Sequence, residues 1–169
     1  VYSHQETGDY YTYIRDQKIG KWLKSKNIKW QQYMQFGVFR GKIDRNKWSK
    51  MWQQQLDRKI LEKPHKINSI DIDIGNIPDD SIFNFEEDFC KGRLKGGRRN
   101  GLKRLNYFLE KKINSYKNDI SNPDKSFDSC SRLSPYISWG CLSLKEIITK
   151  AKMCKSNDIN MFRSRLSWH

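Results

Sequence analysis

Residues 130–143 read Cys-Ser-Arg-Leu-Ser-Pro-Tyr-Ile-Ser-Trp-Gly-Cys-Leu-Ser, and this stretch decides the fold that the sequence predicts. Proline suits the first position of a helix, so we expect a helix to begin near Pro135, with Ser134 as its N-cap. The free N–H groups of that helix end, with the hydroxyls of Ser131 and Ser134, favour an anion such as phosphate. Arg132 adds a charge that pairs with phosphate or carboxylate. From spacing alone, an ordinary capped helix after a loop is the commoner explanation.

The same stretch closely resembles the flavin-phosphate segment of the DNA photolyase/cryptochrome family, in which the motif usually reads T-S-R-L-S-P-Y-L-x-F-G-x-L-S. The matching residues are Ser131-Arg132-Leu133-Ser134-Pro135-Tyr136, Trp139-Gly140 and Leu142-Ser143. Cys130 stands where the family usually has Thr, and Trp139 stands where it has Phe. The match is long and unusual in composition, which makes it more specific than a single glycine-rich loop.

A second segment, near the N-terminus, resembles the last part of the antenna domain of that family. The pattern E-T-G-x-x-x-T-Y-x-R-D is formed by Glu6, Thr7, Gly8, Thr12, Tyr13, Arg15 and Asp16, and Ile28, Trp30, Gly37, Val38 and Arg40 continue it. From the residues alone, Arg15 and Asp16 are a surface ion pair on a helix, which contributes little stability. The resemblance instead implies that this region packs two domains together.

The periodicity of the first half predicts few regular elements. We expect a strand end at Val1 and Tyr2, a helix over Tyr10–Ser25 that Asn27 closes, and a short strand over 28–36. Residues 44–63 have an amphipathic pattern of one helix, which Pro64 ends, and the tryptophans in it are predicted to pack rather than to stack on bases. The irregular residues that follow, up to residue 85, are predicted to be an interdomain linker.

The second half is predicted to be helical. We expect it to start over 84–90 and to contain a strong helix over 100–115, a helix over 135–154 bent around Gly140, and another over 161–169. Ser143 and Glu146 are spaced as a capping box that restarts the bent helix. The basic run over 91–104 is usually a solvated face, although it is also suited to contact phosphates.

The resemblance implies a mixed fold class: the C-terminal end of an α/β Rossmann-like antenna domain, followed by an incomplete all-α FAD-binding domain. We expect residues 1–43 to end the antenna domain, residues 44–85 to form the amphipathic helix and linker, and residues 86–169 to begin the FAD-binding domain. The chain starts at Val1 and stops just after a helical pattern, so we expect it to be a piece of a longer protein.

The resemblance also implies site residues. Those expected to bind the flavin are Tyr116, Cys130, Ser131, Arg132, Leu133, Ser134 and Phe162. Those expected to face damaged DNA are Arg165, Trp168 and His169. No catalytic residue is expected within this chain, because the usual electron-relay tryptophans and the contacts to the flavin ring would follow residue 169.

Three departures from the family pattern bear on the substrate. The family helix that lines the lesion pocket reads roughly W-x-x-E-L-x-W-R, and Arg165 and His169 replace its acid and its base. Ile120 replaces an Arg that contacts DNA in many photolyases, and Arg98 replaces the acid of a G-G-E motif. These changes alter the polarity of the pocket, so the identity of the lesion is not transferred to this chain.

Composition narrows the class of partner. The chain has 169 residues, with 33 Lys and Arg against 19 Asp and Glu, which gives a net charge of +14. Such a balance favours a polyanion, most simply nucleic acid, although the abundance of Lys, Asn and Ile also fits AT-rich coding. Aromatic residues make up 13% of the chain and offer flat surfaces for bases or a ring cofactor.

The cysteines and apolar runs suggest a bacterial cytoplasmic protein. The four cysteines and three histidines lack zinc-site spacing, so no metal is expected and free thiols fit a reducing compartment. No apolar run reaches membrane-spanning length, and we expect a monomer without a membrane partner. No Ser-His-Asp arrangement, paired-acid site or Walker loop supports a hydrolase.

The resemblance implies a FAD-dependent photolyase that splits pyrimidine dimers in damaged DNA by blue-light-driven electron transfer, with this chain inactive alone. A second antenna chromophore of the folate or deazaflavin type is expected in the full-length protein. Two alternatives stay open: a cryptochrome-like flavin photoreceptor without repair activity, and a flavin-free basic helical protein that binds nucleic acid.

Overall fold

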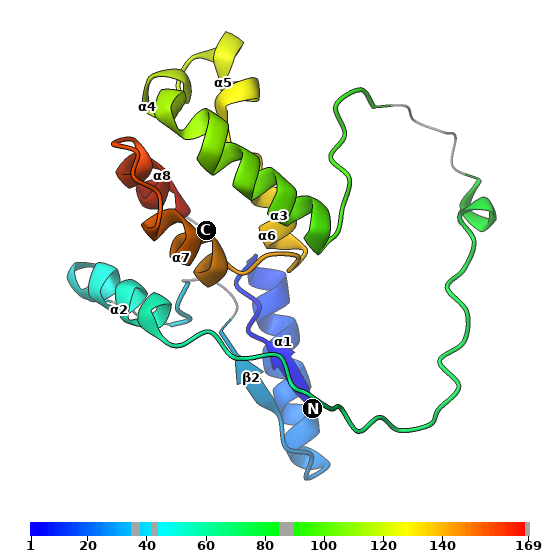
Figure 1. Ribbon diagram of the computed structural model, residues 1–169. Coiled ribbons are helices and arrows are strands. Elements are labelled where there is room, and N and C mark those ends of the chain that lie inside the picture. The colour runs from blue at the N-terminus through cyan, green and yellow to red at the C-terminus, as the bar shows by residue number, and fades with distance from the viewer. Residues whose placement is uncertain (35–37, 42–43, 85–89, 168–169) are drawn as a thin grey trace.

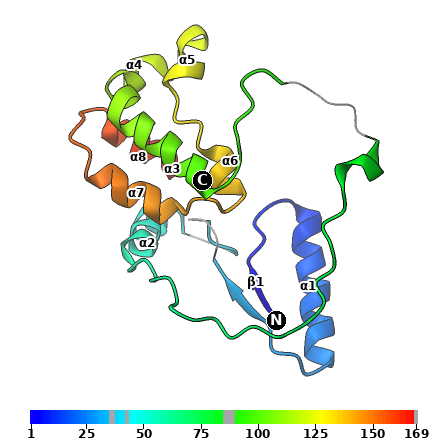
Figure 2. The same cartoon turned by 45° about the vertical axis from the view of Figure 1, so that its right-hand side comes forward.

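The structure is a computed structural model that describes residues 1–34, 38–41, 44–84 and 90–167. It is mostly helical, with one small parallel sheet. The sheet pairs β1 (Tyr2–His4) with β2 (Gln31–Tyr33), so that Tyr2 lies opposite Gln31 and His4 opposite Tyr33. Figures 1 and 2 show this sheet and α1 at one end of the molecule, and α3 to α8 at the other.

Helix α1 (Tyr10–Ser25) has the predicted bounds and connects the two strands. Asp9 is its N-cap, because the Asp9 carboxylate accepts from the N–H of Thr12 at 2.9 Å. Asn27 closes it in the left-handed conformation, with φ of 54°, which Asn tolerates better than most residues. The predicted strand over 28–36 is shorter, since regular pairing covers only β2; residues 35–37 lie outside the described residues.

The interpretation of Arg15 and Asp16 as a surface pair is wrong for Asp16. The Asp16 side chain is buried and forms ion pairs with Arg40 and with Arg15, the latter at 3.0 Å. Arg40 Nε also donates to the carbonyl of Glu6 at 2.6 Å. Asp16 therefore ties α1 to the segment that follows β2, and contributes more than an exposed ion pair would.

Helix α2 (Arg45–Asp57) ends earlier than the apolar pattern predicts. Trp52 and Leu56 pack against the helical core, as predicted, and Trp48 stacks on Trp52 with ring centroids 6.1 Å apart. The backbone turns extended at Arg58, so the next apolar residue pair, at 60 and 61, lies outside the core. The predicted end at Pro64 is wrong because packing, rather than the proline, sets the helix end.

A long exposed segment follows α2. Every residue from 58 to 79 is exposed, and no helix or strand is assigned among them. A 3-10 turn, η1 (Asp80–Phe83), interrupts the segment before it returns to α3. Figures 1 and 2 show it as a wide excursion away from the helices, in keeping with the predicted linker. Residues 85–89, within the predicted start of the helical half, lie outside the described residues.

The helical part consists of one long interrupted helix and several short ones. Its elements in order are α3 (Arg98–Tyr107), the π-helical η2 (Phe108–Lys112), the 3-10 η3 (Ile113–Ser115), α4 (Tyr116–Asp119), α5 (Pro123–Ser129), α6 (Ser134–Ser138), α7 (Leu144–Lys152) and α8 (Ile159–Leu166). The predicted helix over 100–115 is therefore longer and has a π-helical interruption. The predicted break near Gly140 separates α6 from α7, and the predicted capping box of Ser143 and Glu146 is present.

The core lies among these helices. Phe108, Tyr116 and Phe162 form its aromatic centre, with the rings of Phe108 and Phe162 4.7 Å apart. Gly101 lets α3 approach α6, because a Cβ there would come within 3.0 Å of the Tyr136 ring and 3.1 Å of Leu142. This packing positions the stretch from residue 130 to residue 143 against α3.

Candidate functional site

Arg104 of α3 holds the loop over 130–133 in place. Its Nε donates to the carbonyl of Ser131 and its Nη2 to the carbonyl of Cys130, both at 2.9 Å. The guanidinium carbon also lies 5.8 Å from the centroid of the Tyr107 ring. Among the residues that the structure describes, no carboxylate forms a salt bridge with Arg104. The loop therefore sits on a positive charge that is balanced by carbonyl oxygens only.

The helix after this loop begins one residue earlier than predicted. Ser134 is the first residue of α6, and Leu133 occupies the N-cap position with no side-chain capping hydrogen bond. The prediction of Ser134 as the N-cap is therefore wrong: burial of the Leu133 side chain, which is 2% exposed, fixes the start of the helix. The Ser134 side chain is exposed and Ser131 is half-buried, so both hydroxyls are close to the surface.

Arg132 has its own partners. It adopts a left-handed conformation with φ of 53°, which is uncommon for a residue with a long side chain. Its guanidinium carbon lies 4.1 Å from the centroid of the Phe127 ring, and Nη2 donates to the carbonyl of Gly92 at 3.1 Å. The side chain thus links the loop to α5 and to the segment before α3, and its predicted role toward phosphate stays a prediction.

Tyr116, Cys130, Phe162 and Arg165 come from four segments and lie close together. The Tyr116 and Phe162 rings meet edge to face with centroids 5.7 Å apart. Burial and the nearby Cys130 raise the pKa of Tyr116 to about 12, against an opposing effect of the Arg165 charge. Burial also raises the pKa of the Cys130 thiol, and the Arg104 charge opposes that shift. At neutral pH both groups are therefore protonated and uncharged.

The chemistry of the loop fits the phosphate half of FAD. Ser131 and Ser134 supply hydroxyl donors, the loop supplies peptide N–H groups, and Arg104 supplies an adjacent positive charge. In contrast, the side chains of Tyr116, Leu133 and Phe162 pack in the core. Those three residues therefore support the loop from beneath, and the polar residues above them are the ones available to a ligand.

Two predicted DNA-facing residues, Trp168 and His169, lie outside the described residues. The third, Arg165, is half-buried on α8 beside Tyr116. Arg98, which replaces the family acid, pairs with Glu146 across α3 and α7, with Nη1 3.1 Å from Oε2. The hydrogen bond from Arg98 lowers the pKa of Glu146 to about 2 despite partial burial, so Glu146 is ionised at neutral pH.

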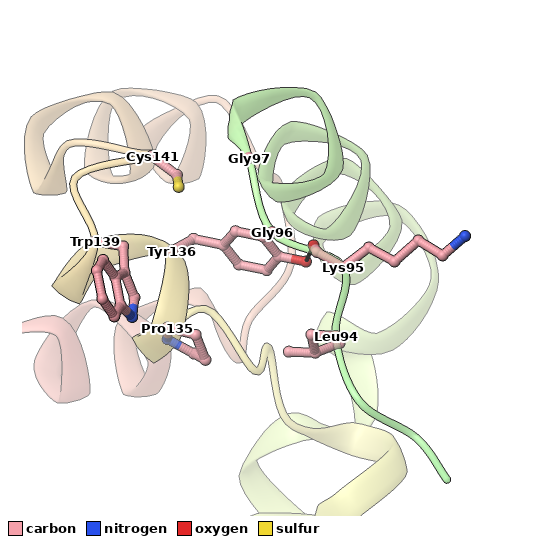
Figure 3. A pocket seen from close by; sticks show the side chains of 8 residues that line it. All are labelled: Leu94, Lys95, Gly96, Gly97, Pro135, Tyr136, Trp139 and Cys141. Carbon is pink, nitrogen blue, oxygen red and sulfur yellow. Dashed lines mark hydrogen bonds between the residues drawn. The ribbon is translucent and has the colours of Figure 1, made fainter. Parts of the chain in front are cut away.

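A cavity that the sequence does not predict lies beside the loop. It has a volume of about 440 Å³ and is lined by Leu94, Lys95, Gly96, Gly97, Pro135, Tyr136, Trp139 and Cys141. Figure 3 shows α6 on one side and the segment before α3 on the other, with the Tyr136 ring between them. The Tyr136 hydroxyl donates to the Lys95 carbonyl at 2.8 Å. Trp139 is 86% exposed.

Arg104 and this cavity are the features that sequence analysis missed. Arg104 belongs to a basic run that is usually solvated, but it follows the buried Gly101 by three residues and precedes the buried Leu105. Helical spacing thus places Arg104 beside the buried face, which is a usable signal. The cavity joins two segments about 40 residues apart, and local pattern gives no sign of that pairing.

Comparison with solved structures finds a bacterial class III photolyase from Agrobacterium tumefaciens. The TM-score is 0.71, the match covers 99% of this chain, and the sequence identity is 15%. This chain folds like part of a photolyase. The match covers 38% of the photolyase chain, so this chain spans well under half the length of that protein. No protein-family model and no curated protein matches the sequence.

The fold predicted from the resemblance is confirmed to that extent. The mostly helical chain with a two-stranded parallel sheet fits a photolyase fragment, whereas the assignment of residues 1–43 to the end of an antenna domain stays a prediction. No described helix has both the length and the apolar character needed to cross a membrane. Within the described residues, no group of three or more His, Cys, Asp or Glu could hold a metal ion.

Proposed function

We propose that this chain is part of a FAD-dependent DNA photolyase that splits pyrimidine dimers under blue light. One observation carries the proposal: the segment with the flavin-phosphate motif, residues 131–143, occurs in a chain that has the fold of a photolyase over 99% of its length. The motif and the fold are independent, because the motif was read from sequence and the structural match has only 15% identity.

In this proposal the loop over 130–134 binds the phosphate groups of FAD. The hydroxyls of Ser131 and Ser134 and the loop N–H groups donate to phosphate oxygens, while the charge of Arg104 favours the anion. Arg104 occupies the loop carbonyls and so keeps these acceptors away from the phosphate. Cys130 and Arg132 hold the ends and turn of the loop, and Tyr116, Leu133 and Phe162 support it from the core.

When bound, reduced FAD supplies the light-excited electron that opens the dimer and to which that electron returns. The chain contributes binding and orientation of that cofactor rather than an acid, a base or a nucleophile. Damaged DNA is the proposed partner, with the lesion flipped out of the duplex. Arg165, Trp168 and His169 are the proposed residues on the DNA side, and Lys and Arg side chains follow the backbone.

A second candidate is a cryptochrome-like photoreceptor that binds flavin and does not repair DNA. The replacement of the family acid and base by Arg165 and His169 favours it, because it changes the polarity of the pocket that would take the lesion. The net charge of +14 instead favours DNA binding, and so the repair enzyme.

A light-dependent repair assay on the full-length protein separates these candidates. The proposed photolyase restores dimer-containing DNA under blue light and does not do so in the dark. A flavin-bound protein that leaves dimers intact under both conditions would establish the photoreceptor and overturn the repair proposal. A protein that binds DNA without flavin would overturn both.

The 169-residue chain alone makes a separate test of the cofactor site. We expect weak or no FAD binding, because the residues proposed to bind FAD here reach only its phosphate half. Titration of FAD with the chain, followed by flavin fluorescence, measures the affinity. Near-stoichiometric binding would contradict the expectation and place the whole flavin site within these residues.

A further inference from the structure

Trp139 stands at the edge of the cavity between α6 and the segment before α3. Its side chain is 86% exposed, while the neighbouring residues Tyr136 and Ile137 are buried. Exposed single apolar residues are common, but this one lines a cavity of about 440 Å³, within the range of about 300–1,000 Å³ typical of ligand sites. Figure 3 shows the Trp139 ring beside α6, with the Tyr136 ring between it and Gly96.

The opposite wall of the cavity belongs to the most basic segment of the chain. Residues 91–104 contain seven Lys and Arg and no Asp or Glu. Six of these cations are exposed, and Arg104 is the one that turns inward. Cationic segments that adjoin an exposed aromatic ring are the combination by which proteins bind single-stranded nucleic acids: charge follows the backbone and the ring stacks on a base.

We propose that this cavity is a binding slot for single-stranded nucleic acid, in which one base stacks on Trp139 and the sugar-phosphate backbone runs along residues 91–99. The slot differs from the loop proposed to hold FAD, since it is lined from residue 135 onward and that loop ends at Ser134. The proposal therefore does not depend on flavin binding.

The walls of the slot allow a backbone to come close. Gly96 and Gly97 have no side chain, and a Cβ added at either would meet nothing within 4 Å. The floor is fixed, because the Tyr136 hydroxyl donates to the Lys95 carbonyl at 2.8 Å. The Lys95 side chain extends outward, away from Trp139, in Figure 3. A base at Trp139 would therefore leave its phosphate on the glycine side, with the Lys95 ammonium further along the strand.

Electrostatics at the rim are compatible with an anion. Arg98 lies beside Cys141, with Nη1 3.4 Å from the Cys141 carbonyl, and its charge is balanced by Glu146. Lys95 and Arg99 are exposed, and no salt bridge involves them among the described residues. They are the cations assigned to phosphate contact.

The test measures binding of a fluorescently labelled oligothymidylate to the chain by anisotropy, without flavin, light or damage. Trp139→Ala is expected to weaken binding about 5- to 150-fold, as loss of one stacked base does. Trp22→Ala is the matched control, because Trp22 is a 56% exposed tryptophan on α1, away from the basic segment. The exposure of Trp139 makes loss of folding an unlikely cause to confuse the result, and circular dichroism checks it.

Two further variants separate stacking from charge. Gly96→Val fills open space in the wall and is expected to weaken binding while the fold is kept. Lys95→Gln with Arg99→Gln is expected to weaken binding more than Lys18→Gln with Lys21→Gln, which removes the same charge from the exposed side of α1. Equal losses for the two charge variants, equal losses for the two tryptophan variants, or no binding of oligothymidylate would each overturn the proposal.

Failure of this test is distinguishable from failure of the proposed photolyase function. A protein that carries flavin and repairs dimers, but in which Trp139→Ala binds oligothymidylate normally, would overturn the slot alone. A protein that lacks flavin, but in which Trp139→Ala binds weakly, would retain the slot and overturn the photolyase.

Discussion

At the scale of single residues, Arg104 makes the clearest structural contribution to the candidate site. Its two hydrogen bonds, both of 2.9 Å, fix the carbonyls of Cys130 and Ser131 and leave the donors of the loop pointing elsewhere. Hydrogen bonds to a charged group contribute about 1.5–3 kcal/mol each, because the group is costly to leave unpaired when partly buried. The conformation of the loop thus depends on a side chain outside the motif.

Replacement of Arg104 by Met tests this dependence. We expect the free energy of unfolding to fall by about 2–4 kcal/mol, as two charged hydrogen bonds are lost. Lys103→Met is the control, since Lys103 is an exposed neighbour of the same charge and should change stability by no more than about 0.5 kcal/mol. Urea denaturation followed by circular dichroism measures both. Equal effects of the two substitutions would show that Arg104 does not hold the loop.

Asp16 carries a second prediction at this scale. Burial raises the pKa of its carboxyl, but hydrogen bonds from Arg40 and Arg15 outweigh burial and hold the pKa below its usual range. Asp16→Asn removes the charge that balances Arg40, so we expect a loss of about 2–4 kcal/mol in unfolding free energy. Asp71→Asn, in the exposed linker, serves as the control. A variant as stable as the control would mean that the buried pair contributes nothing.

At the scale of elements, the pair of Arg98 and Glu146 joins the first turns of α3 and α7. Because Arg98 replaces an acid of the family pattern, this chain has exchanged a carboxylate for a cation that meets the Glu146 carboxylate across the two helices. Glu146 also completes the capping box with Ser143. One side chain therefore caps a helix and links it to its neighbour.

The low pKa of Glu146 gives this link a pH dependence. Its pKa falls from 4.5 to about 2 on folding, so its stabilising effect is complete above about pH 4.5 and is lost as the pH falls toward 2. After allowance for the exposure of Arg98, we expect about 1–2 kcal/mol. Glu146→Gln should flatten the stability curve between these pH values, whereas Glu110→Gln should not. Parallel curves for Glu146→Gln and the unmodified chain would contradict this.

Sequence pattern predicts the elements whose ends depend on local chemistry. Helix α1 is predicted from end to end because Asp9 and Asn27 mark its limits, and the capping box of α7 is equally local. The end of α2 and the start of α6 are mispredicted because distant packing decides them: apolar residues at 60 and 61 find no core, and burial of Leu133 takes the cap position from Ser134.

The candidate site shows the same division. The motif over 130–134 is visible in the sequence, but the contacts of Arg132 with Phe127 and of Arg104 with the loop are not. Both contacts depend on how segments roughly 5 to 30 residues apart meet, and no local periodicity encodes that. Trp139 is visible only as a departure from the family motif, and its cavity requires the fold.

At the scale of the whole molecule, the long exposed segment separates the sheet and α2 from α3. None of residues 58–79 is buried, so they contribute little to the folded state. Deletion of residues 66–77 leaves 28 of the 40 residues between α2 and α3, which span up to about 90 Å. We expect the unfolding free energy to change by less than about 1 kcal/mol, as loop closure depends weakly on length. A loss above about 2 kcal/mol, measured by urea denaturation, would show that the segment packs on the helices.

The claim that this chain belongs to a light-driven flavin enzyme is tested most directly by the absorption spectrum of the full-length protein purified from cells. The account predicts the bands of a bound flavin in the near-ultraviolet and blue, which disappear from the protein fraction once the cofactor is released. A colourless protein that still binds DNA would contradict it and would leave a basic nucleic-acid-binding protein with a photolyase-like fold.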